Sequence, residues 1–575
     1  MTLSCSSSRR RMAAASVVFS APLFASACAG GGSSPGGGGI GVAPTQAPSH
    51  TAPVAITIHW PTPPSAASRR RPSYISSSTE SVGIIVNGGA ATYVNNPALS
   101  GTPVAATVTN VDAPVQPAPD TFSITSYDKA GGAGNILGQA SVPQVIKLGA
   151  ANIVDVTLNG NLGKIVCMAI TPFVSGTSAM TLVGPAGQIA LLPEDADGNI
   201  IVAPGAVPTL SLAAPSAASA TVTTTSTPNL FNINVLTAGT PVALSGTGEN
   251  LAGTAVAPAT CNVTRVKALY VANQGAHLYD SPSVTIYPAT ASGDATPTAT
   301  LVGSSTDEAE INFVAVDPKG NLFLSNQGPE PNATFGPTAG YVSIFGPAAG
   351  QSGNVAPIAT IANLNTPEGL AFDSSNDLWV LSIDRIQEYP PSADGVTAAP
   401  SPSTTITGPN TGLNGLYGLD VGLDGTVYAA GTNFSSSCEI EIFAPGSSGN
   451  ASETTIVPSA ATTESWIGVA ADSTGNMYAT ASQSNLNFVV SYAPQTSSGA
   501  PAASFVATGF SQPFGIFVDK SGATPTNAVW VANYANGSIS YFSSTSTLAL
   551  GEASATSTLS GTDTGLNYPF GVYVR

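Results

Sequence analysis

A pattern of about 50 residues repeats from residue 266 to the end of the chain. Each copy has a small residue followed by apolar residues, then a tight turn and a second apolar run, as in residues 313–323 and 468–478. The copies begin at residues 313, 369, 418, 468, 515 and 571. Repeats of this length predict similar structural units packed side by side, and this constrains the fold more than any other feature.

A second marker runs in parallel with the first through the same region. The third expected strand of each unit ends in an aromatic residue: Tyr287, Phe345, Tyr389, Phe443, Tyr492 and Phe542. A short fourth strand follows a turn rich in glycine, serine and alanine, and four strands per repeat are typical of a propeller blade. We therefore expect an all-β chain in which residues 266–575 form a six-bladed β-propeller.

The two ends of this region are incomplete in complementary ways. Residues 571–574 have the pattern of an innermost strand with no unit after it. Residues 268–273 have the pattern of a second strand with no innermost strand before it. We expect these segments to share one sheet, because their pairing removes an open sheet edge.

The turns of the repeat carry a resemblance to a known family. Asp317 and Asp472 each begin an Asp-x-x-Gly-Asn turn, in which the carboxylate binds backbone amides and glycine takes a positive φ. This pattern resembles NHL-repeat propellers and the related gluconolactonase-like and streptogramin-lyase-like folds. The resemblance implies the fold. It also implies two possible chemistries, since gluconolactonase-like propellers hold a divalent metal at the channel and streptogramin-lyase-like propellers use a histidine base.

The N-terminus has the pattern of an export signal. Three arginines at 9–11 precede a short apolar stretch, and the small residues at 25–27 precede Cys28. This resembles the lipobox of bacterial lipoproteins, in which the cysteine is lipidated; ordinary signal-peptidase cleavage after residue 27 is the alternative. We expect a signal peptide over 1–27, a lipid anchor at Cys28 and a disordered, flexible linker over 28–78.

The region between the linker and the repeats has the pattern of β-sandwiches. Apolar and polar residues alternate between turn signals, as in residues 121–128. The strand spacing resembles the Ig-like modules of bacterial surface proteins, and we expect two such domains, over 79–162 and 163–265. Cys167 and Cys261 lie in the second domain, where export favours a disulfide; two buried thiols are the alternative.

The mouth of the central channel is the expected ligand site. In such propellers, the loops entering the innermost strands and those between the second and third strands share one face. The expected contact residues are Glu310, Asn312, Glu368, Tyr417, Trp466, Phe514, Phe570 and His277. The second set of loops also offers Asp280, Asp384, Arg385, Asn433, Tyr534 and Asn536.

These residues predict binding rather than catalysis. His277 has no second histidine beside it, and Glu310, Asn312 and Glu368 do not reproduce a recognised metal motif, so we expect no catalytic residue, metal or cofactor. The net charge of −17 argues against nucleic acid as a partner. We expect an exported cell-envelope protein, held at the membrane through Cys28, whose propeller binds protein or carbohydrate. A metal-dependent lactonase- or lyase-like enzyme and a purely structural envelope protein are the alternatives.

Overall fold

The computed structural model of the protein describes residues 50–60, 76–100, 105–170, 172–174, 180–203, 205–275, 282–306, 311–328, 339–347, 352–391, 401–432, 438–457, 465–483, 486–522 and 524–575. The chain is nearly all β, with 52% of residues in strands and 3% in helices, which confirms the all-β prediction. Within these ranges no helix is long and apolar enough to cross a membrane. Cys28 lies outside them.

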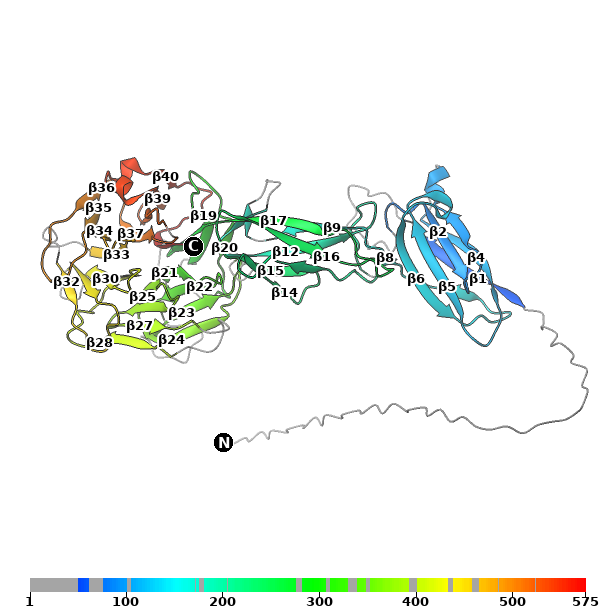
Figure 1. The fold of residues 1–575 in the computed structure, drawn as a ribbon, viewed down its shortest axis with the longest axis horizontal. Helices are drawn as coiled ribbons and strands as arrows, with labels where there is room; N and C mark the ends of the chain where they lie inside the picture. Colours follow the sequence, from blue (N-terminus) through cyan, green and yellow to red (C-terminus); the bar gives the residue numbers. More distant parts are fainter. Residues whose placement is uncertain are drawn as a thin grey trace, which may run out of the picture.

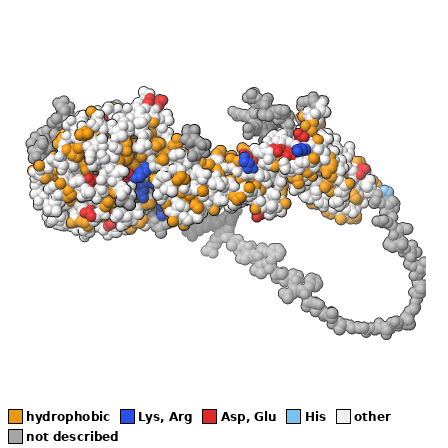
Figure 2. Space-filling model, turned by 45° about the horizontal axis from the view of Figure 1, so that its top comes forward, with side chains coloured by type: hydrophobic (Ala, Val, Ile, Leu, Met, Phe, Trp, Pro, Cys, Tyr) orange, Lys and Arg blue, Asp and Glu red, His pale blue; other side chains and the backbone are white. Residues whose placement is uncertain are grey.

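Three β bodies follow one another along the long axis of the molecule, two sandwiches and then a larger group of sheets (Figure 1). Charged side chains are few and scattered on the face shown in Figure 2, as expected for a chain with 8% charged residues.

The first sandwich packs two sheets around one apolar core. The smaller sheet has the order β4-β1-β7, with β1 (Thr51–His59), β4 (Ala106–Pro114) and β7 (Asn152–Val154). The larger sheet has the order β3-β2-β5-β6-β8, with β2 (Ser81–Val86), β3 (Thr92–Asn95), β5 (Asp120–Tyr127), β6 (Ile136–Gln144) and β8 (Asn159–Gly160). Two short 3-10 helices, η1 (Pro97–Ser100) and η2 (Ala130–Gly132), connect strands.

Strand β1 corrects one expected boundary. We expected a linker over 28–78, but residues 51–59 form the central strand of a sheet, antiparallel to β4 and parallel to β7. The strand alternates strictly, and Ala52, Val54, Ile56 and Ile58 are all buried. A period of two is the signature of a strand with one buried face. The proline- and threonine-rich composition around these residues obscured it.

The second sandwich packs a five-stranded sheet on a four-stranded sheet. The first has the order β10-β11-β17-β16-β13, with β10 (Phe173–Val174), β11 (Met180–Val183), β13 (Ser211–Ala213), β16 (Pro241–Thr247) and β17 (Ala259–Val266). The second has the order β14-β15-β12-β9, with β9 (Lys164–Ala169), β12 (Ala186–Glu194), β14 (Ala220–Thr224) and β15 (Leu230–Val235).

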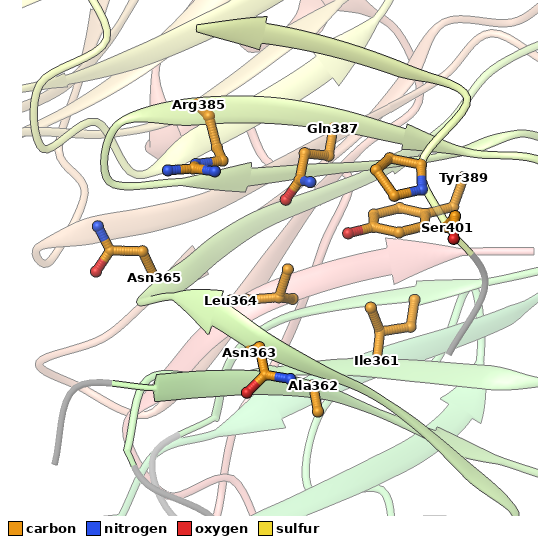
Figure 3. Close-up of a pocket in the computed structure, with 10 residues that line it drawn as sticks. Ile361, Ala362, Asn363, Leu364, Asn365, Arg385, Gln387, Tyr389 and Ser401 are labelled. Carbon is orange, nitrogen blue, oxygen red and sulfur yellow. The ribbon is translucent and has the colours of Figure 1, made fainter. Parts of the chain in front are cut away.

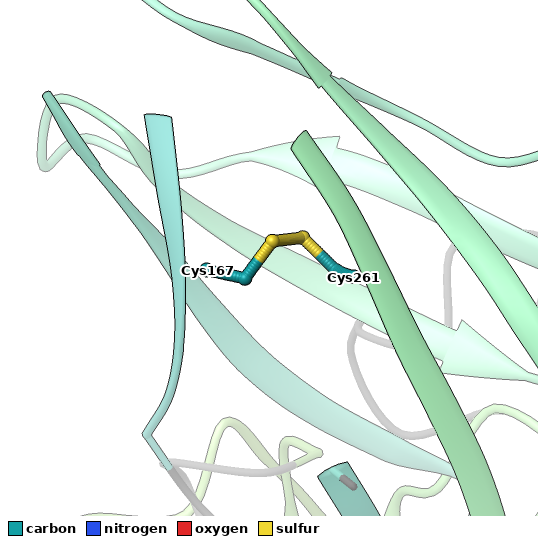
Figure 4. Close-up of a disulfide and its surroundings, with 2 residues drawn as sticks. All are labelled: Cys167 and Cys261. Atoms are coloured by element: carbon teal, nitrogen blue, oxygen red, sulfur yellow. A yellow bond between two sulfur atoms is a disulfide. The ribbon is translucent and has the colours of Figure 1, made fainter. Parts of the chain in front are cut away.

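A disulfide joins the two sheets of this sandwich. Cys167 of β9 and Cys261 of β17 are bonded through their sulfurs, with Cα atoms 5.7 Å apart (Figure 4). The two residues are 94 positions apart in the sequence. A bond across so long a loop restricts the unfolded chain strongly.

Replacing both cysteines by alanine is expected to destabilise the second sandwich by about 3 kcal/mol. The loss arises from the greater conformational freedom of the unfolded chain. Chemical denaturation of the full chain, followed by hydrogen exchange in β9 and β17, measures it. Reducing agent should destabilise the wild type to the same extent and leave the double variant unchanged; an equal response of both proteins would contradict the prediction.

The third body consists, in the described part of the chain, of six antiparallel four-stranded sheets. The first has the order β20-β19-β18-β41, with β18 (Ala268–Asn273), β19 (Ser283–Pro288), β20 (Ala299–Leu301) and β41 (Pro569–Val574). The next two run in sequence order: β21 (Ile311–Val316), β22 (Leu322–Asn326), β23 (Ala339–Phe345), β24 (Ala359–Asn365); then β25 (Pro367–Phe372), β26 (Leu378–Ser382), β27 (Arg385–Tyr389), β28 (Thr404–Thr407).

The last three sheets also run in sequence order. They contain β29 (Gly418–Val421), β30 (Val427–Thr432), β31 (Cys438–Phe443), β32 (Thr454–Ile456); β33 (Ser465–Ala471), β34 (Met477–Gln483), β35 (Leu486–Tyr492), β36 (Phe505–Thr508); and β37 (Pro513–Asp519), β38 (Ala528–Asn533), β39 (Ser538–Phe542), β40 (Ser557–Leu559). A one-turn helix α1 (Thr545–Leu548) and a 3-10 turn η4 (Glu552–Ser554) connect β39 to β40.

The innermost strands of these sheets close a ring. Strands β21, β25, β29, β33, β37 and β41 each contact the next in this order, and β41 contacts β21. The last strand completes the first sheet, because β41 pairs antiparallel with β18, with Val574 opposite Leu269. Strands near the ring centre, such as β18 and β41, are buried at every position. Because both faces of these strands are buried, their sequences are mostly apolar and do not alternate between apolar and polar residues.

The second sandwich packs against one end of this ring. Val183 of β11 shares an apolar core with Tyr270 of β18. Asn234 donates a hydrogen bond from Nδ2 to the carbonyl oxygen of Pro318, 3.3 Å away. Pro318 lies in the turn that follows the innermost strand β21. The sandwich therefore contacts the end of the ring where innermost strands finish, and the site described next lies where they begin.

A buried carboxyl group in the fourth sheet of the ring makes stability depend on pH. Glu441 of β31 is 1% exposed and accepts a hydrogen bond from Thr455 Oγ1 at 2.9 Å. Burial first, then Glu439 and Glu453, raises its pKa from 4.5 to about 8. The folded chain therefore keeps a proton that the unfolded chain releases above about pH 4.5, so stability is lost as the pH rises toward 8.

We expect the unfolding temperature of the ring to fall between about pH 5 and pH 8.5 through this group. Glu441→Gln, which mimics the protonated form, should remove most of the fall, worth a few kcal/mol because one pKa unit corresponds to about 1.4 kcal/mol. Thermal unfolding at both pH values measures it. The exposed Glu249 provides the control, since Glu249→Gln should leave the pH dependence intact; a fall that survives in Glu441→Gln would contradict the assignment.

Candidate functional site

A β-bulge near the start of most innermost strands turns side chains toward one mouth of the ring. The register shifts between Ile311 and Val314 in β21, and between the corresponding residues of β25, β33 and β37. In β41 the shift falls opposite residues 272 and 273. Bulges bend a strand and redirect its side chains. The redirected positions include Asn312, Glu368, Phe514 and Phe570.

Three of these bulges share one local sequence, X-Pro-(Glu or Phe)-Gly. The residue X has a positive φ in each, 51° for Thr366, 51° for Gln512 and 54° for Tyr568. This conformation is strained for a residue other than glycine, and such strain concentrates at functional sites. The glycine lets neighbouring innermost strands meet, because a Cβ on Gly515 would lie 2.3 Å from the carbonyl oxygen of Phe570.

One side of the mouth is a chain of hydrogen-bonded amides around a carboxylate. Gln274 donates from Nε2 to Asn312 Oδ1 at 2.9 Å, and Asn312 donates from Nδ2 to Glu368 Oε2 at 2.7 Å. Gln327 donates to the other oxygen of Glu368. Burial, and then the charge of Glu368, raises the pKa of the nearby Tyr417. Tyr417 therefore lies beside this carboxylate, on the polar side of the mouth.

The other side of the mouth is a continuous aromatic wall, formed by Phe313, Phe514, Tyr534, Tyr568 and Phe570. The Phe514 ring stacks on Tyr534 with centroids 4.5 Å apart and meets Phe570 edge-on at 5.0 Å. Phe570 meets Phe313 at 5.4 Å, and Tyr534 meets Tyr568 at 5.0 Å. Four of the rings are half-buried and Phe570 is buried. Aromatic faces that remain partly exposed are suited to ligand contact.

The structure brings together five of the eight residues expected at the mouth. Asn312, Glu368 and Tyr417 lie on its polar side, and Phe514 and Phe570 on its aromatic side. Trp466 lies in β33 with its backbone opposite Ala481. Glu310 and His277 fall outside the described residues.

Four residues of the site were missed in the sequence. Gln274 and Gln327 each directly follow a second strand, β18 and β22, and belong to the loops we had identified. Tyr568 and Phe313 flank expected residues. The X-Pro-(Glu or Phe)-Gly pattern could have identified Tyr568, since it recurs at 366–369, 512–515 and 568–571.

The described residues do not fit the metal centre that the gluconolactonase-like resemblance implies. A metal site needs oxygen atoms of several residues turned toward one point. Here Asn312 turns its amide nitrogen to Glu368, and its oxygen is taken by Gln274. The cluster of acidic groups that could hold an ion in the described chain is elsewhere, at Asp373, Asp377 and Glu388.

No family model matches the chain, and no curated protein matches it. Among solved structures, a protein from Lactobacillus plantarum is 14% identical, covers 54% of this chain and 99% of its own, and has a TM-score of 0.33. A luciferin-regenerating enzyme is 12% identical, covers 59% of this chain and 98% of its own, with a TM-score of 0.26. A protein from Bacteroides thetaiotaomicron is 12% identical, with coverages of 61% and 93% and a TM-score of 0.25.

Proposed function

We propose that residues 266–575 form a six-bladed β-propeller of the NHL type, preceded by two Ig-like sandwiches, in an exported protein anchored to the cell envelope through a lipid on Cys28. The closed ring of six four-stranded sheets supports the propeller. The disulfide between Cys167 and Cys261 agrees with export, because such bonds persist in oxidising compartments.

The propeller serves as a non-catalytic binding platform for protein or carbohydrate. The aromatic wall at the mouth carries this proposal: its residues Phe313, Phe514, Tyr534 and Tyr568 are only half-buried, and the hydrogen-bonded amides of the polar side of the mouth lie beside them. Partly exposed aromatic side chains with nearby hydrogen-bonding groups are enriched at recognition surfaces. The second sandwich packs at the opposite end of the ring, and a lipid tether beyond it would direct the mouth away from the membrane.

The metal-dependent lactonase- or lyase-like alternative lacks a supporting observation in the described residues. Its expected ligands Asn312 and Glu368 are hydrogen-bonded to each other through an amide nitrogen. A purely structural role predicts that no soluble ligand binds the mouth, so the same binding experiment separates it from the platform.

The test is a glycan-array and pull-down screen with the mature full-length chain, repeated with Tyr534→Ala. Loss of a partly buried aromatic anchor should weaken mouth-dependent hits about thirtyfold or more, since such anchors contribute about 2 kcal/mol or more. Tyr541→Ala is the matched control, because Tyr541 is also half-buried but packs on Trp530 at 5.0 Å, away from the mouth. If every hit tolerates Tyr534→Ala as well as Tyr541→Ala, the mouth is not the binding face.

A further inference from the structure

A polar pocket opens between two neighbouring sheets of the ring; its lining includes Arg385, which we had expected at the mouth, and none of the residues that form the two sides of the mouth. It has a volume of about 300 Å³ and lies between β24 of one sheet and β27 of the next (Figure 3). Its lining is formed by Ile361, Ala362, Asn363, Leu364, Asn365, Arg385, Gln387, Tyr389, Ser401 and Pro402. Small-molecule sites range from roughly 300 to 1,000 Å³, so this pocket suits a ligand of one small ring.

The two facing strands build the pocket in different ways. Strand β24 carries a register shift relative to β23, since Ile361 pairs with Val342 but Leu364 pairs with Gly340. Asn363 lies within this irregularity at a φ of 63°, a conformation that asparagine tolerates better than most residues. Alternation along β27 places its residues 385, 387 and 389 on one face. Figure 3 shows Gln387 and Tyr389 directed across the pocket toward β24.

The guanidinium group of Arg385, the cationic group of the pocket, forms an ion pair with the neighbouring Asp384. Arg385 donates from Nε and Nη2 to the two carboxylate oxygens of Asp384, both at 2.9 Å. Asn365 also bonds this carboxylate, and Arg385 is the main reason that the pKa of Asp384 is lowered. An arginine fixed in this bidentate geometry keeps its remaining N–H groups in a defined direction. The pocket therefore offers a donor without a net positive charge.

The remaining polar groups offer hydrogen bonds to a ligand. In the described part of the chain, the side chains of Asn363, Gln387 and Ser401 have no hydrogen-bond partner, and the Tyr389 hydroxyl has none. Asn363 and Ser401 are exposed and Gln387 is half-buried, so these side chains are open to a ligand that enters from solvent. Amide and hydroxyl groups can both donate and accept. A ligand that matches them must carry several groups that do the same.

We propose that this pocket binds a single neutral sugar unit, either a free monosaccharide or one unit of a longer glycan. Sugar hydroxyls donate and accept hydrogen bonds like the amides and hydroxyls of the lining. The Arg385–Asp384 pair leaves no charge that would select an ionic ligand. This site is additional to the channel mouth and does not depend on the proposed function of the mouth.

The test is ligand-observed NMR on the full chain with glucose, N-acetylglucosamine and maltotriose as probes. We expect at least one probe to bind in the millimolar range, with Gln387→Ala and Asn363→Gly each weakening binding about three- to tenfold through loss of a hydrogen bond. Glycine keeps the positive φ of Asn363, so the backbone is preserved. Asn376→Gly is the matched control, because Asn376 has a φ of 66° but does not line the pocket.

Each outcome of this experiment decides the proposal. Stronger binding of maltotriose than of glucose assigns the pocket to a unit of a glycan, and equal binding assigns it to a free sugar. The proposal is overturned if no probe binds at tens of millimolar, or if Asn376→Gly weakens binding as much as Asn363→Gly and Gln387→Ala do.

Discussion

Removing residues 569–575 is expected to abolish the cooperative unfolding transition of the six-sheet ring. The deletion removes β41, the innermost strand of the first sheet, which contacts both β37 and β21. All six residues of β41 are buried. Its four large apolar side chains, Phe570, Val572, Tyr573 and Val574, would each forgo about 1.5–3 kcal/mol of burial. The total approaches the whole stability of a typical domain, about 5–15 kcal/mol.

Loss of β41 also exposes hydrogen-bonding groups that the ring otherwise hides. Strand β18 would become an unpaired edge with every side chain apolar or buried, and such edges promote aggregation. Calorimetry and limited proteolysis of the truncated chain measure the effect. A sigmoidal transition of the ring at the wild-type temperature would show that closure contributes little.

A point substitution in β41 tests the contribution of this strand to ring closure without shortening the chain. Val572→Asp buries a charge at a position that is 6% exposed, whereas Val506→Asp in β36 changes a valine that is 52% exposed. We expect the first to destabilise the ring by about 4 kcal/mol or more. The second should change stability by less than about 0.5 kcal/mol.

The repeating part of the fold could be predicted from the sequence because every repeat contains the same pattern of apolar runs and turn residues. Asp317 illustrates this: its carboxylate accepts the amide of Asn321 at 2.7 Å, as the Asp-x-x-Gly-Asn motif indicates. The pairing of the two ends was also predictable, since residues 268–273 and 569–574 each lacked a neighbour in the pattern. Because the same strand and turn pattern occurs in several repeats, each copy supports the assignment of strands in the others.

The candidate site was predictable only to the level of loops. Asn312 and Glu368 were expected at one mouth, but their hydrogen bond depends on bulges in two different sheets. The aromatic wall depends on β-bulges of the same kind, since Phe514 and Phe570 each lie two positions after a residue with positive φ. A sequence pattern with period two does not indicate where a strand departs from that period. Gln274 and Gln327 were missed because their partners lie in other sheets.

Strand β1 was expected to be part of a linker because of its composition, although its alternation of apolar and polar residues indicates a strand with one buried face. It is the only described link between β4 and β7 in its sheet. Deleting residues 51–60 is therefore expected to unfold the first sandwich. Ala52, Val54, Ile56, Ile58 and Trp60 all belong to the core of that sandwich. The ring should keep its own transition, since it contains none of these residues.

A charge within β1 tests the same point without shortening the chain. Ile56→Asp places a carboxylate where the wild-type side chain is 1% exposed, and we expect a loss of about 4 kcal/mol or more. Ile153→Asp is the matched control on the neighbouring strand β7, because Ile153 is 62% exposed. Chemical denaturation with hydrogen exchange in β2 and β5 reports on this sandwich alone. A free peptide of residues 50–60 should restore protection to the deleted chain, because the groove between β4 and β7 would accept it; equal stability of both isoleucine variants would mean that β1 is not part of the core.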